Sequence, residues 1–102
     1  MNVRFSLLLP LAALTGLAAP AHADLATLKK TCAACHQLDT TLVGPALQAI
    51  AARYRDQPGA EERLIASLRN GSSGQWGKAA MPPAPQISEN DARKLARWVL
   101  QR

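Results

Sequence analysis

The 102-residue chain has few aromatic residues, few cysteines and no run of charges of one sign. Aromatic residues make up 4% of the sequence. The net charge is +5, but lysine and arginine are scattered among acidic residues and form no basic cluster interleaved with aromatic side chains. Nucleic acid is therefore not expected as a partner. The basic balance indicates either a solvated surface of mixed charge or a docking face for an acidic protein.

The sequence also lacks an apolar run long enough to span a bilayer comfortably. The main apolar run, residues 5–17, is short and is interrupted by polar and turn-forming residues. Arg4 precedes this run, and the small-x-small sequence Ala21-His22-Ala23 follows it. This pattern predicts a secretory signal peptide, residues 1–23, that is cleaved after Ala23 and directs the chain to the periplasm without a stable membrane anchor.

Removing 23 of the 102 residues leaves a mature domain of 79 residues, 24–102, and loss of Arg4 lowers the net charge from +5 to +4. A domain of this size buries only a marginal hydrophobic core, so it usually depends on disulfides, a metal, a cofactor or a partner. The mature chain offers two cysteines, Cys32 and Cys35, and His36 follows directly. The sequence CxxCH is typical of covalent c-type haem attachment.

The spacing in this motif has a physical reason. Two thioethers must form on one edge of a porphyrin, and the adjacent histidine must present a ring nitrogen to the iron; two intervening residues on a helical turn meet both demands. A structural zinc site needs four ligands, and only Cys32, Cys35 and His36 remain after the signal peptide has gone. A thioredoxin-like redox pair expects a βαβ context, and a disulfide across CxxC closes too small a loop to stabilise much.

Helical periodicity dominates the mature chain, and no strand pattern is present. The pattern predicts helices over residues 25–35, 46–54, 60–69 and 88–100, with Asp24 and Ser88 as N-caps, Pro45 in the first turn of the second helix and Asn70-Gly71 ending the third. Residues 72–87 have no periodicity and contain Trp76 and Met81. A loop of this length is usually functional or disordered, and we interpret this one as functional.

Taken together, these motifs resemble the small class I cytochromes c of the bacterial cytochrome c-551 (c8) type. The resemblance covers nearly all of residues 24–102 and is carried by CAACH at 32–36, DTTLVGPA at 39–46, RNGSSGQWG at 69–77, AMPP at 80–83 and LARWVLQR at 95–102. It implies an all-α fold, the small cytochrome c fold, in which four to five helices wrap around one haem c.

The resemblance also implies a set of site residues. Cys32 and Cys35 would attach the haem, and His36 and Met81 would be its proximal and distal axial ligands. The Pro45 carbonyl would accept a hydrogen bond from the other ring nitrogen of His36, and the Trp76 indole would reach a haem propionate. Two departures concern tuning: Ala84 stands where the family often has an asparagine, with Pro85-Gln86 suggesting a one-residue insertion, and Ser67 replaces a basic residue that can contact a propionate.

With His36 and Met81 filling both axial positions, the haem would offer no open site for a substrate, so an electron-transfer protein is expected and not an enzyme. The expected function is that of a monomeric, soluble one-electron carrier between respiratory redox partners such as a terminal oxidase, a nitrite reductase or a peroxidase. One alternative is a ligand sensor or peroxidase-like enzyme in which Met81 dissociates easily, and another is a haem module that serves one fixed complex. We further expect cations to surround the exposed haem edge, namely Lys29, Lys30, Arg53, Arg55 and Lys78.

Overall fold

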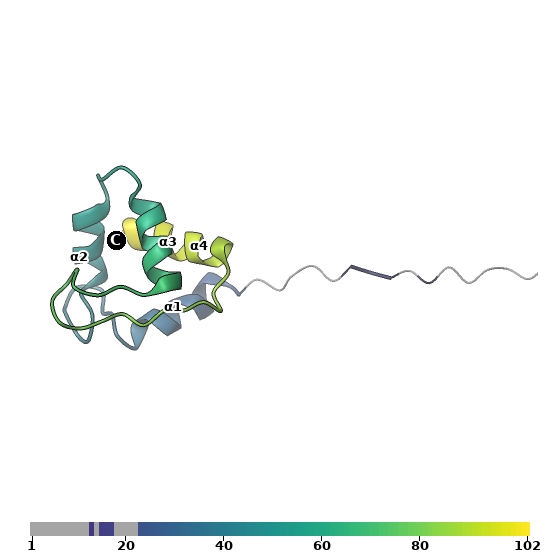
Figure 1. Ribbon diagram of the computed structural model, residues 1–102, viewed down its shortest axis with the longest axis horizontal. Coiled ribbons are helices and arrows are strands. Elements are labelled where there is room, and N and C mark those ends of the chain that lie inside the picture. The colour runs from purple at the N-terminus through teal and green to yellow at the C-terminus, as the bar shows by residue number, and fades with distance from the viewer. Residues whose placement is uncertain (1–12, 14, 18–22) are drawn as a thin grey trace, which may run out of the picture.

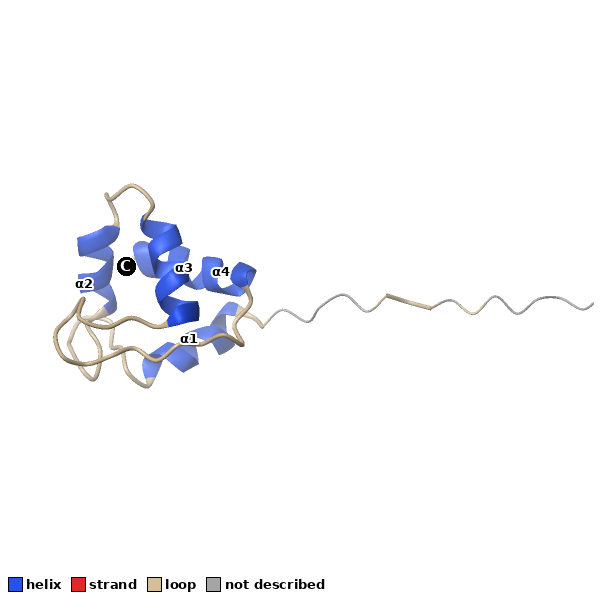
Figure 2. Cartoon of the chain, in the orientation of Figure 1, coloured by secondary structure: helices blue, strands red, loops and turns tan. Residues whose placement is uncertain are grey.

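A computed structural model describes residue 13, residues 15–17 and residues 23–102. The predicted signal peptide therefore lies almost wholly outside the described residues. Four helices are present among these residues, α1 (Leu25–Ala33), α2 (Leu47–Tyr54), α3 (Ala60–Asn70) and α4 (Glu89–Leu100), joined by loops (Figures 1 and 2). In this part of the chain, the one β-type pairing is an isolated antiparallel bridge between Ser72 and Met81. None of the helices described is long and apolar enough to cross a membrane.

Helix α1 begins where the sequence predicts and ends two residues earlier. The Asp24 carboxylate accepts a hydrogen bond from the Thr27 amide at 2.8 Å, which caps the helix and holds the pKa of Asp24 below its usual value. At the other end, the amides of Cys35 and His36 both bond to the Cys32 carbonyl, at 3.1 and 2.9 Å. These bonds tighten the last turn, so the CxxCH motif runs from the helix into a turn.

Helix α2 begins at Leu47, after Pro45 and not around it. Its N-cap residue is Ala46, which has no side chain able to satisfy the free amides of the first turn. Carbonyls of the preceding loop supply the acceptors: Leu47 N donates to Gln37 O at 2.9 Å, and Gln48 N donates to Leu38 O at 3.0 Å. The loop that follows His36 is thereby fastened to the start of α2, and Pro45 lies outside the helix, which corrects its predicted placement.

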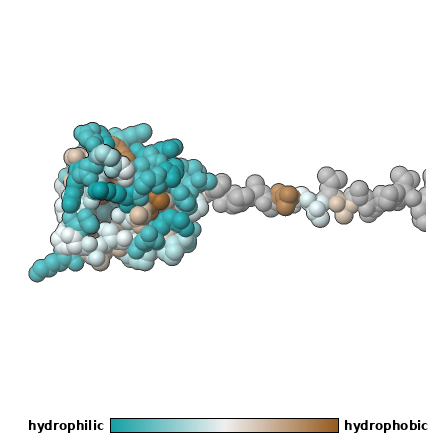
Figure 3. All heavy atoms as spheres, turned by 45° about the horizontal axis from the view of Figure 1, so that its top comes forward, coloured by the Kyte–Doolittle hydropathy of each residue, from teal (hydrophilic) through white to brown (hydrophobic). Residues whose placement is uncertain are grey.

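The predicted boundaries of the last two helices are confirmed to within a residue. Gly71 ends α3 with φ of +78°, and Ser88 caps α4 by accepting a hydrogen bond from the Asp91 amide at 3.1 Å. Helix α4 contacts each of the other three helices. Its inner face, with Ala92, Leu95 and Ala96 fully buried, forms the centre of the domain. Hydrophilic side chains dominate the face seen in Figure 3.

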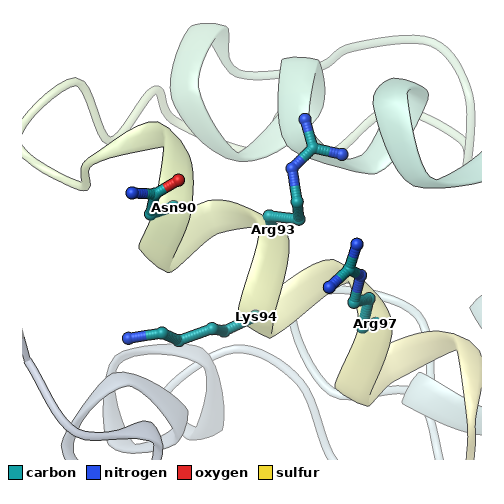
Figure 4. Close-up of a pocket in the computed structure, with 4 residues that line it drawn as sticks. All are labelled: Asn90, Arg93, Lys94 and Arg97. Carbon is teal, nitrogen blue, oxygen red and sulfur yellow. The ribbon is translucent and has the colours of Figure 1, made fainter.

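Charged side chains tie α3 to α4 along their outer edge. Arg93 contacts Glu61 at 2.6 Å and Glu62 at 2.7 Å, and Arg97 contacts Glu61 at 3.1 Å. Hydrogen bonds from Arg93 and Arg97 hold the pKa of Glu61 below its usual value. Figure 4 shows Arg93 and Arg97 on one side of α4 and Lys94 on the other, where Lys94 pairs with Asp91 at 3.1 Å. The positive charges of this surface are therefore matched by carboxylates.

Candidate functional site

A cavity of about 830 Å³ lies between α2, α3 and the long loop that follows α3. Aliphatic side chains such as Leu47, Ile50, Leu64 and Leu68 form much of its wall. A mostly apolar cavity of this size is unusual in a small domain, whose interior is otherwise closely packed, and it suits a large apolar ligand. Every site residue predicted from the sequence lines it: Cys32, Cys35, His36, Pro45, Trp76 and Met81.

Both thiols lie half-buried at one end of the cavity, Cys32 in the last turn of α1 and Cys35 just beyond it. They are free, so no disulfide joins them. Burial raises the pKa of the Cys32 thiol. Among the described residues, no group of three or more His, Cys, Asp or Glu side chains is placed to hold a metal ion.

The ring of His36 is fixed from two sides. Its Nδ1 lies 2.7 Å from the Pro45 carbonyl oxygen. Because a carbonyl can only accept, Nδ1 carries the proton and donates it, which leaves the lone pair on Nε2 free to bind a metal. On the other side, the ring lies against Gly44, where a Cβ atom would come within 2.5 Å of His36 Cε1. Glycine is needed at position 44 because the ring occupies the place of a side chain.

Met81 reaches the cavity from the long loop and is held by backbone bonds to the end of α3. Ser72 N donates to Met81 O at 3.0 Å, and Met81 N donates to Ser72 O at 2.8 Å. Gly71 makes this approach possible, since its φ is positive and a Cβ there would lie 2.7 Å from Met81 O. Three residues later, Ala84 N donates to Leu68 O at 3.0 Å, so the loop is anchored both at Met81 itself and at Ala84.

Trp76 lies on the same loop and is fastened to the end of α2. Its ring meets Tyr54 edge to face, with centroids 6.3 Å apart, and the Arg53 guanidinium lies over it at 4.6 Å. Arg53 also donates to the Gln75 carbonyl at 2.6 Å. A cation over an indole face and a charge-assisted hydrogen bond together hold the loop to α2.

Two of the cations expected around the haem edge, Lys29 and Arg55, contact the C-terminal part of the chain. Lys29 lies over the Trp98 ring at 4.6 Å, and Arg55 donates to the carbonyls of Leu100 and Arg102 at the end of α4. Neither lines the cavity, because each is engaged elsewhere in the fold. The cation that does line it, Arg63, was missed by the sequence analysis, although its place one turn before the cavity-lining Ser67 on α3 was a usable signal.

These residues fit a covalently bound haem. Two thiols lie at one end, an imidazole nitrogen is free to coordinate, and a soft thioether lines the same apolar cavity, which no carboxylate among the described residues enters. The two departures from the family pattern, Ser67 and Ala84, also line this cavity and would act directly on a ligand there.

Comparison with known proteins identifies relatives over most of the chain. Residues 19–99 match the family model described as cytochrome c oxidase, cbb3-type, subunit III. Cytochrome c-552 of Nitrosomonas europaea is 50% identical over 82 residues, which cover 80% of this chain and 79% of the relative. Cytochrome c-551 of Pseudomonas aeruginosa is 48% identical over 71 residues, covering 70% and 67%. The crystal structure of the Nitrosomonas europaea protein superimposes with a TM-score of 0.69 at 47% identity, over 74% of this chain and 93% of that one.

Proposed function

The chain belongs to the family of small class I c-type cytochromes, and we propose that it works as a periplasmic one-electron carrier with a His/Met-ligated haem. The chain is accordingly an electron-transfer protein and not an enzyme, and it carries one covalently attached haem c. The observation that carries the finer proposal is the convergence of two thiols, an imidazole ring and a thioether on one apolar cavity.

In this proposal Cys32 and Cys35 would attach the haem through thioether bonds, and His36 and Met81 would coordinate its iron. When bound, the haem would supply one-electron chemistry, because its iron can be ferrous or ferric. With both axial positions taken by side chains, the chain leaves no coordination site for a substrate. This arrangement disfavours the sensor and peroxidase-like alternatives.

The side chains around the ligands set how readily the iron gives up its electron. The Pro45 carbonyl accepts the Nδ1 proton of His36, which fixes the ring and makes the free nitrogen a better donor. The neutral, soft sulfur of Met81 would favour ferrous iron, and the largely apolar walls would disfavour the extra positive charge of the ferric form. The stronger His36 donor would lower the reduction potential, whereas the Met81 sulfur and the apolar walls would raise it.

Electrons would pass where the cavity reaches the surface. The loop between His36 and α2 exposes Leu38, Leu42 and Val43, of which Val43 also lines the cavity, and Trp76 is 36% exposed at another edge. A small apolar patch beside a buried redox centre suits brief docking with redox proteins, among them a terminal oxidase, a nitrite reductase or a peroxidase. The predicted signal peptide, residues 1–23, supports the periplasm as the site of this exchange.

The first test is the visible absorption spectrum of the protein, oxidised and reduced, after expression in a host that attaches c-type haem. We expect low-spin spectra and, in the ferric form, the weak red charge-transfer band of a methionine-bound iron. The Met81→Ala variant should lose that band while keeping its haem, and Met1 outside the mature domain offers no replacement. A high-spin spectrum of the unaltered protein, or rapid carbon monoxide binding to its ferrous form, would favour the sensor alternative.

A further inference from the structure

Arg63 is the one charged side chain among the described residues that lines the cavity, His36 aside. The guanidinium of Arg63 bonds to an uncharged group, because its Nη1 donates to the Gln57 side-chain oxygen at 3.0 Å. The surface arginines of α4 behave differently, since Arg93 and Arg97 are each within 3.1 Å of a carboxylate. Arg63 thus brings a positive charge to a cavity whose other lining residues supply no negative one.

The place of Arg63 in the cavity is fixed by the helices. The start of α2 is bonded to the loop just after the CxxCH motif, through Leu47 N and Gln37 O. Tyr54, at the far end of α2, lines the cavity close to the turn that holds Gln57. Eight helical residues rise by about 11 Å, so the turn with Gln57, to which Arg63 bonds, and the loop after the CxxCH motif are separated by roughly the length of α2.

Haem has the matching polarity. Its two vinyl groups, which become thioethers, occupy one edge of the macrocycle, and its two propionates occupy the opposite edge. A haem attached at Cys32 and Cys35 therefore directs its carboxylates towards the end formed by Tyr54 and Arg63. A guanidinium suits a carboxylate because its planar fork can donate two parallel hydrogen bonds.

We propose that Arg63 is the charge partner of a haem propionate and supplies, one turn earlier on α3, the positive charge that Ser67 lacks. Residues 63 and 67 are four apart on one helix and both line the cavity, so the two positions share a face. This inference rests on the proposed haem attachment. It assigns Arg63 a role as a positioning and tuning residue, since it acts on the propionate and not on the iron.

The reduction potential should register this pairing. An unpaired negative charge near the iron stabilises the ferric state and so lowers the reduction potential. Pairing a propionate with Arg63 weakens this effect and raises the potential. Arg63→Gln should consequently lower the midpoint potential. Arg63→Lys keeps the charge and should stay close to the unaltered protein, although a lysine cannot reproduce the forked geometry.

The test measures midpoint potentials of the holoproteins by spectroelectrochemical titration and records the propionate bending mode by resonance Raman spectroscopy. We expect R63Q to shift both, and the double variant R63Q/S67R, which returns a cation to the same wall, to restore the potential. Lys94→Gln is the control, since it removes one charge from the outer surface of α4 (Figure 4). A potential in R63Q equal to that of K94Q, or one that S67R does not restore, would overturn the inference. The charge-transfer band of the unaltered protein separately tests the proposed ligation.

Discussion

Gly44→Ala tests the fixed orientation of the His36 ring directly. The new Cβ would lie 2.5 Å from Cε1 and 2.9 Å from Nδ1 of His36, whereas non-bonded carbons rest at about 3.5–4.0 Å. The ring must retreat by about 1 Å, which would stretch the 2.7 Å contact between Nδ1 and the Pro45 oxygen beyond hydrogen-bonding range. Gly44 does not have a positive φ, so backbone strain plays no part.

Two opposing contributions set the expected magnitude. Loss of the hydrogen bond costs about 1 kcal/mol, and leaving the partly buried Pro45 carbonyl without a donor raises this to about 1–3 kcal/mol. Alanine in place of glycine restricts the unfolded chain, which returns about 0.4–1 kcal/mol. We therefore expect a net loss of about 1–2 kcal/mol in the free energy of unfolding of the ferric holoprotein, as the two contributions combine.

Guanidinium unfolding followed by haem absorbance gives the free energy of unfolding. Proton NMR of the ferrous protein gives the chemical shift of the Nδ1 proton of His36. The control is Leu42→Ala two residues away, because that side chain is 51% exposed and should change stability by less than about 0.5 kcal/mol. A Gly44→Ala protein with unchanged stability and an unshifted Nδ1 proton would show that the ring has room to move and that the contact with Gly44 does not fix it.

Three further predictions concern the helices and the attachment site. Leu95→Ala removes the largest fully buried side chain and should cost about 2–5 kcal/mol in denaturant unfolding of the holoprotein, whereas a cost below that range would mean that α4 repacks. Hydrogen bonds from Arg93 and Arg97 depress the pKa of Glu61, so the ionised Glu61 stabilises the fold above its ordinary pKa of about 4.5 and loses this effect as pH falls through the lowered pKa. Glu61→Gln should therefore flatten the pH dependence of the melting temperature in acid. An unchanged slope would contradict this prediction. Replacing Cys32 and Cys35 by alanine together should leave an unfolded or labile chain without haem, which native-like helical circular dichroism of that variant would refute.

Periodic sequence patterns predicted the helices well because each helix buries one stripe. The stripe of α4 is the clearest case, since Ala92, Leu95 and Ala96 recur at helical spacing and are fully buried. Side-chain caps were equally predictable: Asp24 and Ser88 each accept a hydrogen bond from an amide three residues later. These features depend on residues close together in the chain, so the sequence contains all that decides them.

The features that the sequence could not predict depend on contacts between distant segments. Helix α2 begins at Leu47 because carbonyls of the preceding loop bond to its first amides, and no side-chain pattern records such bonds. Lys29 was expected near the haem edge, but Trp98 on α4 holds it. The spacing of Arg63 from Ser67 pointed to a shared helix face, but Arg63 is an exposed charged residue and the sequence does not show where α2 lies, so its place at the cavity was overlooked.

The size of the buried side chains explains why the cofactor completes this fold. Ten hydrophobic residues are buried in the part of the chain that the structure describes; five of them are alanines, and Leu95 is the largest of the side chains that are fully buried there. Alanines let α4 lie close to its neighbours, but they bury little apolar area, and burial of apolar area is the main source of stability. The larger aliphatic residues Leu47, Ile50, Leu64 and Leu68 instead turn at least part of their surface to the cavity. A haem bound in the cavity would provide the apolar partner for these residues, and we therefore expect attachment and folding of the domain to be coupled.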